Sequence, residues 1–477
     1  MFVNETALGQ TGPQADLRRS AIHAVLYLLG RQSVVALLAL VGEPLIARAV
    51  GPAQYGLWVA ALGLFTYARG VGSCGIDIYL IRSEKSLSPE QSHQAFTILA
   101  GLGLTCLVVS TFALPLAQSW MKMPGFSPVA TGLFITLPVC LTSLVPLAML
   151  ERSLDYRRIA LVDIASRVVF YGLTLALIVK GYRIWSLIAG WWAQQLLLAA
   201  SYYAMTAYRP RLLLNRSVAR DMVGYGLGYS ASIWIYQLRT LVNPLIVGRY
   251  AGAAAVGYIG LAERLVLMLG FAKGAAWRIS IPVLARIQND KRLMCRAVNQ
   301  GMTLQVLAFA PILLGFSLLL SPIVRILFGA RWLPVLQIFP FVAVLYLVNS
   351  MFALHSSALY TLRQNRRVAV FHLFHICLLA GSALLLVPRM GWLGWGWPEL
   401  LAIASYGVVS QYVAIEIGDL DYGFTAPVVV ATSLALFWRD LGAASFLGLV
   451  ALAIWPPTWR NMRLLGVQLR GALLGES

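Results

Sequence analysis

Residues 236–278 read YQLRTLVNPLIVGRYAGAAAVGYIGLAERLVLMLGFAKGAAWR. The stretch contains two apolar spans joined by a short Gly/Ala turn, and inside or close to these spans it carries Arg239, Glu263, Arg264 and Lys273. An ionisable side chain in hydrocarbon is costly unless it faces a partner or a water-filled cavity. The stretch therefore predicts membrane-spanning helices that line a polar site.

A similar pattern occurs in the first half of the chain. Residues 44–46, 51–56 and 68–70 (PLI, GPAQYG and ARG) are echoed in the same order by residues 244–246, 252–257 and 272–274 (PLI, GAAAVG and AKG). Basic residues take matching places in the last pair, Arg69 in one copy and Lys273 in the other. We interpret the chain as a duplication with two related halves, an arrangement in which transporters commonly bind substrate between the repeats.

The composition excludes a water-soluble protein. Hydrophobic residues make up 59% of the 477 and charged residues 12%, and the mean hydropathy is +0.76, which indicates an all-helical polytopic membrane protein. The net charge of +19 is divided among short loops, so it indicates membrane topology and not a nucleic-acid partner. Residues 1–17 are polar and the first apolar run is long enough to remain as an anchor, so we expect no cleaved secretory signal.

The apolar runs predict about fourteen transmembrane helices at about 20 residues per crossing. Arginine and lysine are concentrated in alternate loops, and if these loops are cytoplasmic both termini are cytoplasmic as well. The basic residues that remain outside the loops are Arg31, Arg69, Arg167, Arg239, Arg264, Lys273 and Arg278. Most of them lie on the leading pair of helices of each half, so these helices are expected to line something polar.

Neither a cofactor nor a metal is expected. The five cysteines are scattered without a C-x-x-C pair, which indicates neither a disulfide framework nor a zinc site. His372 and His375 lie one helical turn apart without a carboxylate or thiol beside them, so we interpret them as buried hydrogen-bonding residues. The chain also lacks the phosphate-binding loop and the hydrolase motifs, so we expect neither ATP hydrolysis nor covalent chemistry.

An ordered series of short motifs resembles one known family. The motifs are LERSLDYRR at 150–158, KGYRIWSL at 180–187, YRPRL at 208–212, LIVGRYAG at 245–252 followed by Gly257 and Tyr258, IPVLARI at 281–287 and FGARW at 328–332. Together they make the chain similar to the bacterial polysaccharide (oligosaccharide-lipid) flippases of the multidrug/oligosaccharidyl-lipid/polysaccharide exporter superfamily.

The resemblance implies two six-helix lobes around a central cavity, followed by two extra helices. The corresponding segments would be an N-terminal lobe at 1–207, a cytoplasmic linker at 208–222, a C-terminal lobe at 223–418 and a last pair of helices with a cytoplasmic tail at 419–477. The implied substrate is a polyprenyl-pyrophosphate-linked oligosaccharide, moved from the inner to the outer leaflet by alternating access. One departure concerns Asn243, because similar members often have an acidic residue there.

The basic residues in the apolar spans suit the negative charge of such a substrate. A pyrophosphate bearing a sugar loses its hydrogen bonds to water in hydrocarbon, and fixed cations can replace them. Arginine offers forked donors matched to phosphate oxygens, and lysine offers a compact charge. The candidate headgroup-binding residues are therefore Arg31, Arg69, Arg239, Arg264 and Lys273. Glu263 and Arg264 are adjacent on one helix, and either could instead form a structural ion pair with another helix. Glu43, Asp77 and Glu263 are candidate counter-ions for these cations or candidate groups for ion coupling of transport. If the acidic residue that similar members have at the position of Asn243 serves ion coupling, transport by this chain either uses one of these three acids for coupling or is not ion-coupled.

The sequence thus predicts a secondary transporter, not an enzyme, in the bacterial inner membrane, where it serves cell-surface or exopolysaccharide synthesis. Its expected partners are the lipid-linked oligosaccharide, membrane lipids and other glycan-assembly membrane proteins. One alternative keeps the fold and makes the chain a cation-coupled multidrug exporter, although the candidate cavity helices hold more basic than acidic residues. A less favoured alternative is an integral-membrane glycan polymerase or ligase, which would need catalytic groups outside the membrane, whereas every outer turn is short.

Overall fold

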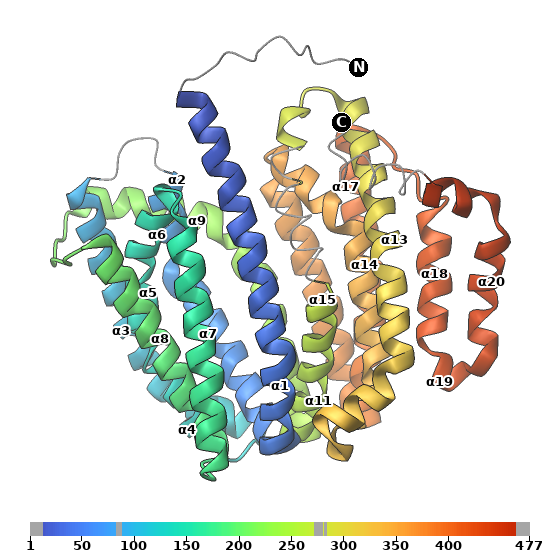
Figure 1. The fold of residues 1–477 in the computed structure, drawn as a ribbon, viewed down its shortest axis with the longest axis horizontal. Coiled ribbons are helices and arrows are strands. Elements are labelled where there is room, and N and C mark those ends of the chain that lie inside the picture. The colour runs from blue at the N-terminus through green and yellow to red at the C-terminus, as the bar shows by residue number, and fades with distance from the viewer. Residues whose placement is uncertain (1–12, 83–87, 271–279, 281–283, 464–477) are drawn as a thin grey trace. The chain divides into compact units, whose positions relative to one another are not determined.

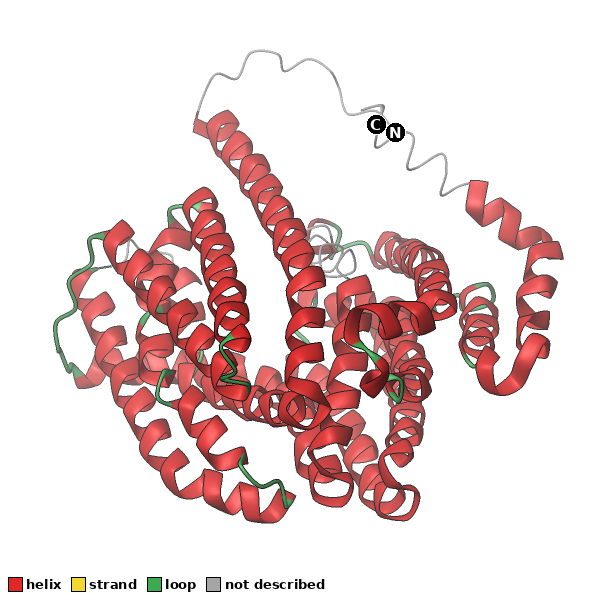
Figure 2. Ribbon diagram, turned by 60° about the horizontal axis from the view of Figure 1, so that its bottom comes forward, coloured by secondary structure: helices red, strands yellow, loops and turns green. Residues whose placement is uncertain are grey.

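The computed structural model describes residues 13–82, 88–270, 280 and 284–463, and within these ranges all regular elements are helices (Figure 2). This outcome follows from the bilayer, because a helix satisfies its own backbone hydrogen bonds where no water is available. In the described part of the chain, seven helices are long and apolar enough to cross a membrane, or up to nine if each bent pair is one span. The prediction of an all-helical polytopic membrane protein is confirmed.

The number of crossings stays a prediction, because several of these helical elements are long. Four of them contain 37 to 53 residues, enough for more than one crossing at about 20 residues each. The seven are Val34–Ser73, Pro89–Met121, Tyr156–Val179, Ile233–Leu269, Lys291–Phe328, Val335–Thr361 and Asn365–Ile417, and the bent pairs are Phe126–Thr142 with Leu144–Arg152 and Thr425–Leu436 with Trp438–Ile454.

Two compact units make up the structure, and each is built from separate stretches of sequence. The first contains the described parts of 1–46, 68–114 and 128–230, and the second those of 47–67, 115–127 and 231–477. A short stretch that includes the motif at 51–56 thus belongs to the second unit. The lobe boundaries expected from the resemblance remain predictions.

The first unit is organised around the hairpin of α7 and α8, which run side by side in Figure 1. Besides parts of α1 (Pro13–Ser73), α3 (Pro89–Met121), α4 (Phe126–Phe134) and α9 (Arg216–Gln237), its elements are α2 (Ile76–Arg82), α5 (Leu137–Thr142), α6 (Leu144–Arg152), α7 (Tyr156–Val179) and α8 (Ile184–Thr206). The Asp155 side chain caps the start of α7 by accepting from the backbone N–H of Arg158. Ile159 and Val162 of α7 then pack against Tyr202 of α8.

The second unit surrounds α14 (Val335–Thr361), which is apolar on all sides and therefore buried rather than amphipathic. Around it pack α11 (Gly248–Leu269), α13 (Lys291–Ile323), α15 (Asn365–Met390), α16 (Gly396–Leu401), α17 (Tyr406–Ile417) and α18 (Thr425–Leu436). The remaining elements are α10 (Arg239–Val242), η1 (Asn243–Val247), η2 (Val324–Phe328), η3 (Ala330–Trp332), η4 (Gly391–Trp395), η5 (Ala402–Ser405), α19 (Trp438–Leu441), η6 (Gly442–Phe446) and α20 (Leu447–Ile454). The pair α18 and α20 lies beside α13 (Figure 1).

The repeated sequence motif corresponds to a repeated break in the backbone. Gly51 interrupts α1 with φ 78° and ψ 168°, and Gly252 interrupts α11 with φ 80° and ψ 178°. Residues with a side chain rarely adopt this conformation, whereas glycine does so without steric cost. We call residues 51–56 the first copy and residues 252–257 the second copy of the kink motif.

The two copies of the kink motif contact each other inside the second unit. A Cβ on Gly56 would lie 1.7 Å from the carbonyl oxygen of Ala253, and a Cβ on Gly257 would lie 2.3 Å from that of Pro52. Only glycine allows the two backbones to approach so closely, as in other helix pairs packed through small residues. The last glycine of each copy is therefore required by the other copy.

An arginine three residues before each kink glycine holds the end of another helix. Arg48 Nη1 donates to the carbonyl oxygen of Ile326 at 2.8 Å, and Arg249 Nη1 donates to that of Trp120 at 2.9 Å. Carbonyls in the last turn of a helix lack helical partners and carry partial negative charge. Each copy of the kink motif is thus joined to the end of a long helix, α13 with η2 in one case and α3 in the other.

Candidate functional site

The structure does not describe all of the predicted binding residues. Lys273 lies outside the described residues, and of Arg31 only the backbone, within α1, is described. Their predicted roles therefore stay predictions.

Two of the predicted residues interact electrostatically in the first unit. Arg69 is exposed in the last part of α1, and its charge acts on Asp77 at the start of α2. Burial raises the pKa of the Asp77 carboxyl, and backbone hydrogen bonds together with Arg69 offset only part of this effect. The Oδ1 atom of Asp77 is buried without a hydrogen-bond partner. Glu43, elsewhere in the same unit, accepts a long hydrogen bond of 3.4 Å from the Tyr171 hydroxyl.

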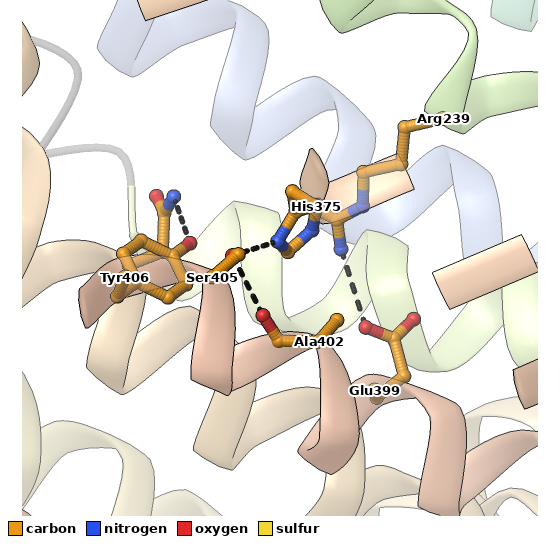
Figure 3. A network of polar contacts seen from close by, with 7 residues as sticks. Arg239, His375, Glu399, Ala402, Ser405 and Tyr406 are labelled. Carbon is orange, nitrogen blue, oxygen red and sulfur yellow. Dashed lines mark hydrogen bonds and ion pairs between the residues drawn. The ribbon is translucent and has the colours of Figure 1, made fainter. Parts of the chain in front are cut away.

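The second unit contains the more extensive polar site. Arg239 of α10 reaches Glu399 of α16, with 3.5 Å between Nη2 and Oε2 (Figure 3). The side chain of Glu399 is fully buried, whereas 18% of the Arg239 side chain is exposed. The guanidinium also lies 5.6 Å from the centroid of the Tyr346 ring. Arg239 is therefore held by an acid and an aromatic ring, and a small part of its side chain stays exposed.

Further ionisable side chains surround this pair. Glu263, on α11, interacts electrostatically with both Arg239 and Glu399. The His372 ring lies 4.9 Å from that of Tyr236. We call the set the C-terminal polar cluster, and it consists of Arg239, Glu263, Tyr346, His372, His375, Glu399 and Tyr406. Arg264 follows Glu263 and is half-buried on α11.

Hydrogen bonds fix the orientation of His375 and Tyr406. The Ser405 hydroxyl donates to the carbonyl oxygen of Ala402 at 2.7 Å, and the same oxygen lies 2.9 Å from His375 Nδ1 (Figure 3). A hydroxyl has a single proton to donate, so Nδ1–H of His375 must be the donor to Ser405. Asn349 Nδ2 donates to the Tyr406 hydroxyl at 2.7 Å. The prediction that His375 is a buried hydrogen-bonding residue is confirmed.

Breaks in the helices bring the cluster together. Pro244 stands in a π-helical turn, η1, that directly follows α10, and such turns locally rearrange the helix backbone. On the opposite side, η4, α16 and η5 replace one regular helix by three short segments. Gly396 allows close packing there, because a Cβ at this position would lie 2.5 Å from the Phe341 ring. Glu399 is carried inward by this broken segment.

Two carboxylates, those of Glu263 and Glu399, act on the Arg239 guanidinium. Glu399 is fully buried and makes the direct contact. Because a buried charge without a partner is strongly unfavourable, Arg239 stabilises the ionised form of Glu399.

Sequence reasoning selected Arg239 and Glu263 but missed Glu399, Tyr346 and the participation of the histidines. The signal for Glu399 was present, since it is a single acid in the apolar run WPELLAIA at 397–404. A charge at membrane depth needs a partner or a water-filled cavity, and this holds for Glu399 as it does for Arg239.

A family model described as polysaccharide biosynthesis protein matches residues 45–337. The chain belongs to this family. The match includes both copies of the kink motif together with Arg239 and Glu263. It ends before Glu399.

Two curated relatives, both named for polysaccharide biosynthesis, are similar to this chain at low sequence identity. The succinoglycan biosynthesis transport protein ExoT of Rhizobium meliloti is 24% identical over 62% of this chain and 60% of its own length. The lipopolysaccharide biosynthesis protein WzxC of Escherichia coli is 24% identical over 66% of this chain and 65% of its own length. The chain thus spans just under two thirds of the length of these two relatives.

Solved structures confirm the fold. The lipid II flippase MurJ, in an inward closed conformation, aligns with a TM-score of 0.70 at 12% identity, over 95% of this chain and 100% of that one. An inward-facing multidrug resistance transporter of the MATE family aligns with a TM-score of 0.62 at 15% identity, over 82% of this chain and 98% of that one. Both are helical membrane transporters, and the likeness concerns the fold alone.

Proposed function

We propose that this chain moves a polyprenyl-pyrophosphate-linked oligosaccharide from the inner to the outer leaflet of the bacterial cytoplasmic membrane, without covalent chemistry. Arg239 is the observation that carries the proposal. Its guanidinium is set among apolar helices, and 18% of its side chain is exposed. A permanent positive charge with forked donors at this depth suits the phosphate oxygens of a lipid-linked glycan.

Family membership and the named relatives support this proposal. Both relatives are named for the biosynthesis of surface or exported polysaccharides, and a solved flippase of a lipid-linked substrate has the same fold. The proposed headgroup-binding residues are Arg31, Arg69, Arg239, Arg264 and Lys273. Both termini are proposed to be cytoplasmic, because arginine and lysine are concentrated in the corresponding loops. Membrane lipids and other glycan-assembly membrane proteins are the proposed partners.

A cation-coupled multidrug exporter is the second candidate. It is favoured by one feature of the C-terminal polar cluster, namely that Glu263, Glu399 and the Tyr346 ring lie around Arg239. Carboxylates and aromatic rings are the groups that bind organic cations. The relatives' names do not suggest such a cargo, so we place this candidate second.

Deletion of the protein in its native host tests the proposal. Loss of a flippase should leave a completed repeat unit on its lipid carrier in the inner leaflet, which can be identified by mass spectrometry of extracted lipids. Loss of one sugar or a change in chain length would favour an enzyme instead. Increased sensitivity to cationic dyes, with normal glycan export, would favour the multidrug exporter.

A further inference from the structure

Two ion pairs of the second unit have the same composition and different surroundings. In each, an arginine pairs with a glutamate and lies 5.6 Å from the centroid of a tyrosine ring, Tyr346 for Arg239 and Tyr412 for Arg367. The Arg367–Glu416 pair is tight, at 2.6 Å, and its side chains are 30% and 21% exposed. The Arg239–Glu399 pair is longer, at 3.5 Å, although Glu399 is fully buried.

The buried carboxylate of Glu399 makes weaker hydrogen bonds than a fully buried carboxylate usually does. A tight charge-assisted hydrogen bond between nitrogen and oxygen measures about 2.7–2.9 Å, and the contact with Arg239 exceeds this length. The other oxygen, Oε1, is buried without a hydrogen-bond partner. Trp395 interacts with the carboxylate, but its indole nitrogen makes no hydrogen bond of ordinary geometry. The ionised state of Glu399 therefore depends on Arg239.

A phosphate group competes for the same guanidinium. The substrate of the proposed function carries a diphosphate, which offers more charge and more acceptor oxygens to the forked donors of Arg239 than one carboxylate does. Arg239 is the partly exposed member of the pair and Glu399 is the buried one, so a ligand reaches the arginine first. Once the arginine turns to phosphate, Glu399 is left as a buried carboxylate beside Glu263.

We propose that Glu399 is the internal counter-ion of Arg239, that the diphosphate of the substrate displaces it, and that the displaced carboxylate takes up one proton. This inference rests on the proposed function. No covalent bond to the substrate forms or breaks: a proton from water binds a Glu399 oxygen, and the Arg239 hydrogen bond passes from carboxylate to phosphate. Neutralisation avoids leaving an unpaired buried charge. Glu399 thereby links occupancy of the site to proton uptake.

The other ionisable groups around Glu399 do not replace it in this role. Glu263 is half-buried and acts on Arg239 electrostatically, whereas Glu399 makes the direct contact. His375 already uses its Nδ1 proton in the bond to Ser405. Among the described residues, Arg239, Glu263, Tyr346 and Tyr406 interact electrostatically with Glu399. His372 and His375 interact with Arg239.

The test measures binding against pH for the full-length protein in nanodiscs. The probe is a polyprenyl pyrophosphate linked to one sugar, because a diphosphate diester stays ionised over the neutral range and adds no titration of its own. If binding takes up one proton, affinity should increase about tenfold for each unit that the pH falls. Glu399→Gln should bind with almost no pH dependence, and at high pH it should bind about tenfold more tightly than the wild type, because Arg239 is no longer neutralised. Glu416→Gln, in the matched pair, should keep the wild-type slope.

A wild-type slope retained in Glu399→Gln would overturn the inference and leave the proposed function standing. Absence of binding by the wild type would refute the proposed function itself. Direct proton uptake, recorded with an indicator dye in weak buffer on adding the probe to the wild type, gives a second readout that does not depend on any variant folding. Uptake close to one proton per bound lipid supports the inference, and no uptake contradicts it.

Discussion

The two copies of the kink motif have the same backbone and different charges. Gly51 and Gly252 have nearly identical backbone angles, and each is preceded by an arginine that holds the end of another helix. After the first copy the chain continues LWVAALGLF (57–65), whereas after the second it continues YIGLAERLV (258–266), with an acid and a base. The two copies thus share the glycine and the arginine that shape the helices, while the C-terminal polar cluster occurs beside the second copy.

The residue before each Pro-Leu-Ile stretch differs as well. Glu43 occupies this place in the first half and Asn243 in the second. Asn243 Oδ1 is buried without a hydrogen-bond partner, and Glu43 accepts from Tyr171. The second half thus lacks an acid at this position, and it holds Glu263 and Glu399 around Arg239 instead. The comparison indicates that the two copies share their backbone geometry and differ in the ionisable side chains around them.

The largest effect is expected from removing the cation of the C-terminal polar cluster. Arg239→Gln leaves Glu399 buried without its partner and should destabilise the protein by about 3–5 kcal/mol. The double variant Arg239→Gln with Glu399→Gln should recover most of this stability, because it leaves no unpaired buried charge. Glycan export should be lost in the single variant and in the double variant, because both lack the Arg239 guanidinium. Thermal unfolding in detergent and export by a deletion strain measure the two effects.

The exposed pair provides the control for that prediction. Arg367→Gln removes the same kind of side chain where both partners are partly exposed, so it should cost less than about 1 kcal/mol and leave export intact. If the double variant Arg239→Gln with Glu399→Gln still exports glycan, Arg239 has a structural role only.

A smaller loss is expected when the close approach of the two copies is blocked. Gly56→Ala and Gly257→Ala each place a methyl group against a carbonyl oxygen of the other copy and should destabilise the protein by about 1–3 kcal/mol. Gly101→Ala, on α3, has no neighbouring atom within 4 Å of the added methyl and should be neutral or slightly stabilising. Equal melting temperatures for all three variants would show that the contact does not hold the copies together.

The two arginines before the kink glycines should differ in importance. Arg249 both donates to a carbonyl and stacks at 4.1 Å from the centroid of the Trp120 ring, so Arg249→Ala should cost about 1–2 kcal/mol. Arg48→Ala loses an exposed hydrogen bond and should cost about 0.5 kcal/mol. Urea or thermal unfolding of the two variants, compared with Arg249→Lys, would test the order, and a larger loss at Arg48 would reverse it.

The smallest effect is expected at Arg69, which is exposed and interacts with Asp77. Arg69→Ala should reduce the rate of glycan export less than about fivefold, as for other exposed charge interactions. Arg69→Lys should reduce it less, because the charge is kept and only the forked geometry is lost. Transport of a fluorescent lipid-linked sugar in proteoliposomes gives the rates, and an equal loss in both variants would indicate a packing role.

The sequence by itself determined the all-helical membrane fold, the repeated Gly/Ala motif and the presence of Arg239 and Glu263 in apolar spans. These features could be predicted because the bilayer acts on each span separately: hydropathy identifies a span, a glycine-rich motif identifies a break between spans, and a charge in an apolar run indicates a polar site. That each break is a kink inside one helical element was decided by the structure. Only the tertiary structure decided the partners. Glu399 lies 160 residues from Arg239 in the chain, and their contact requires the broken helices around both to pack together, which no local pattern specifies.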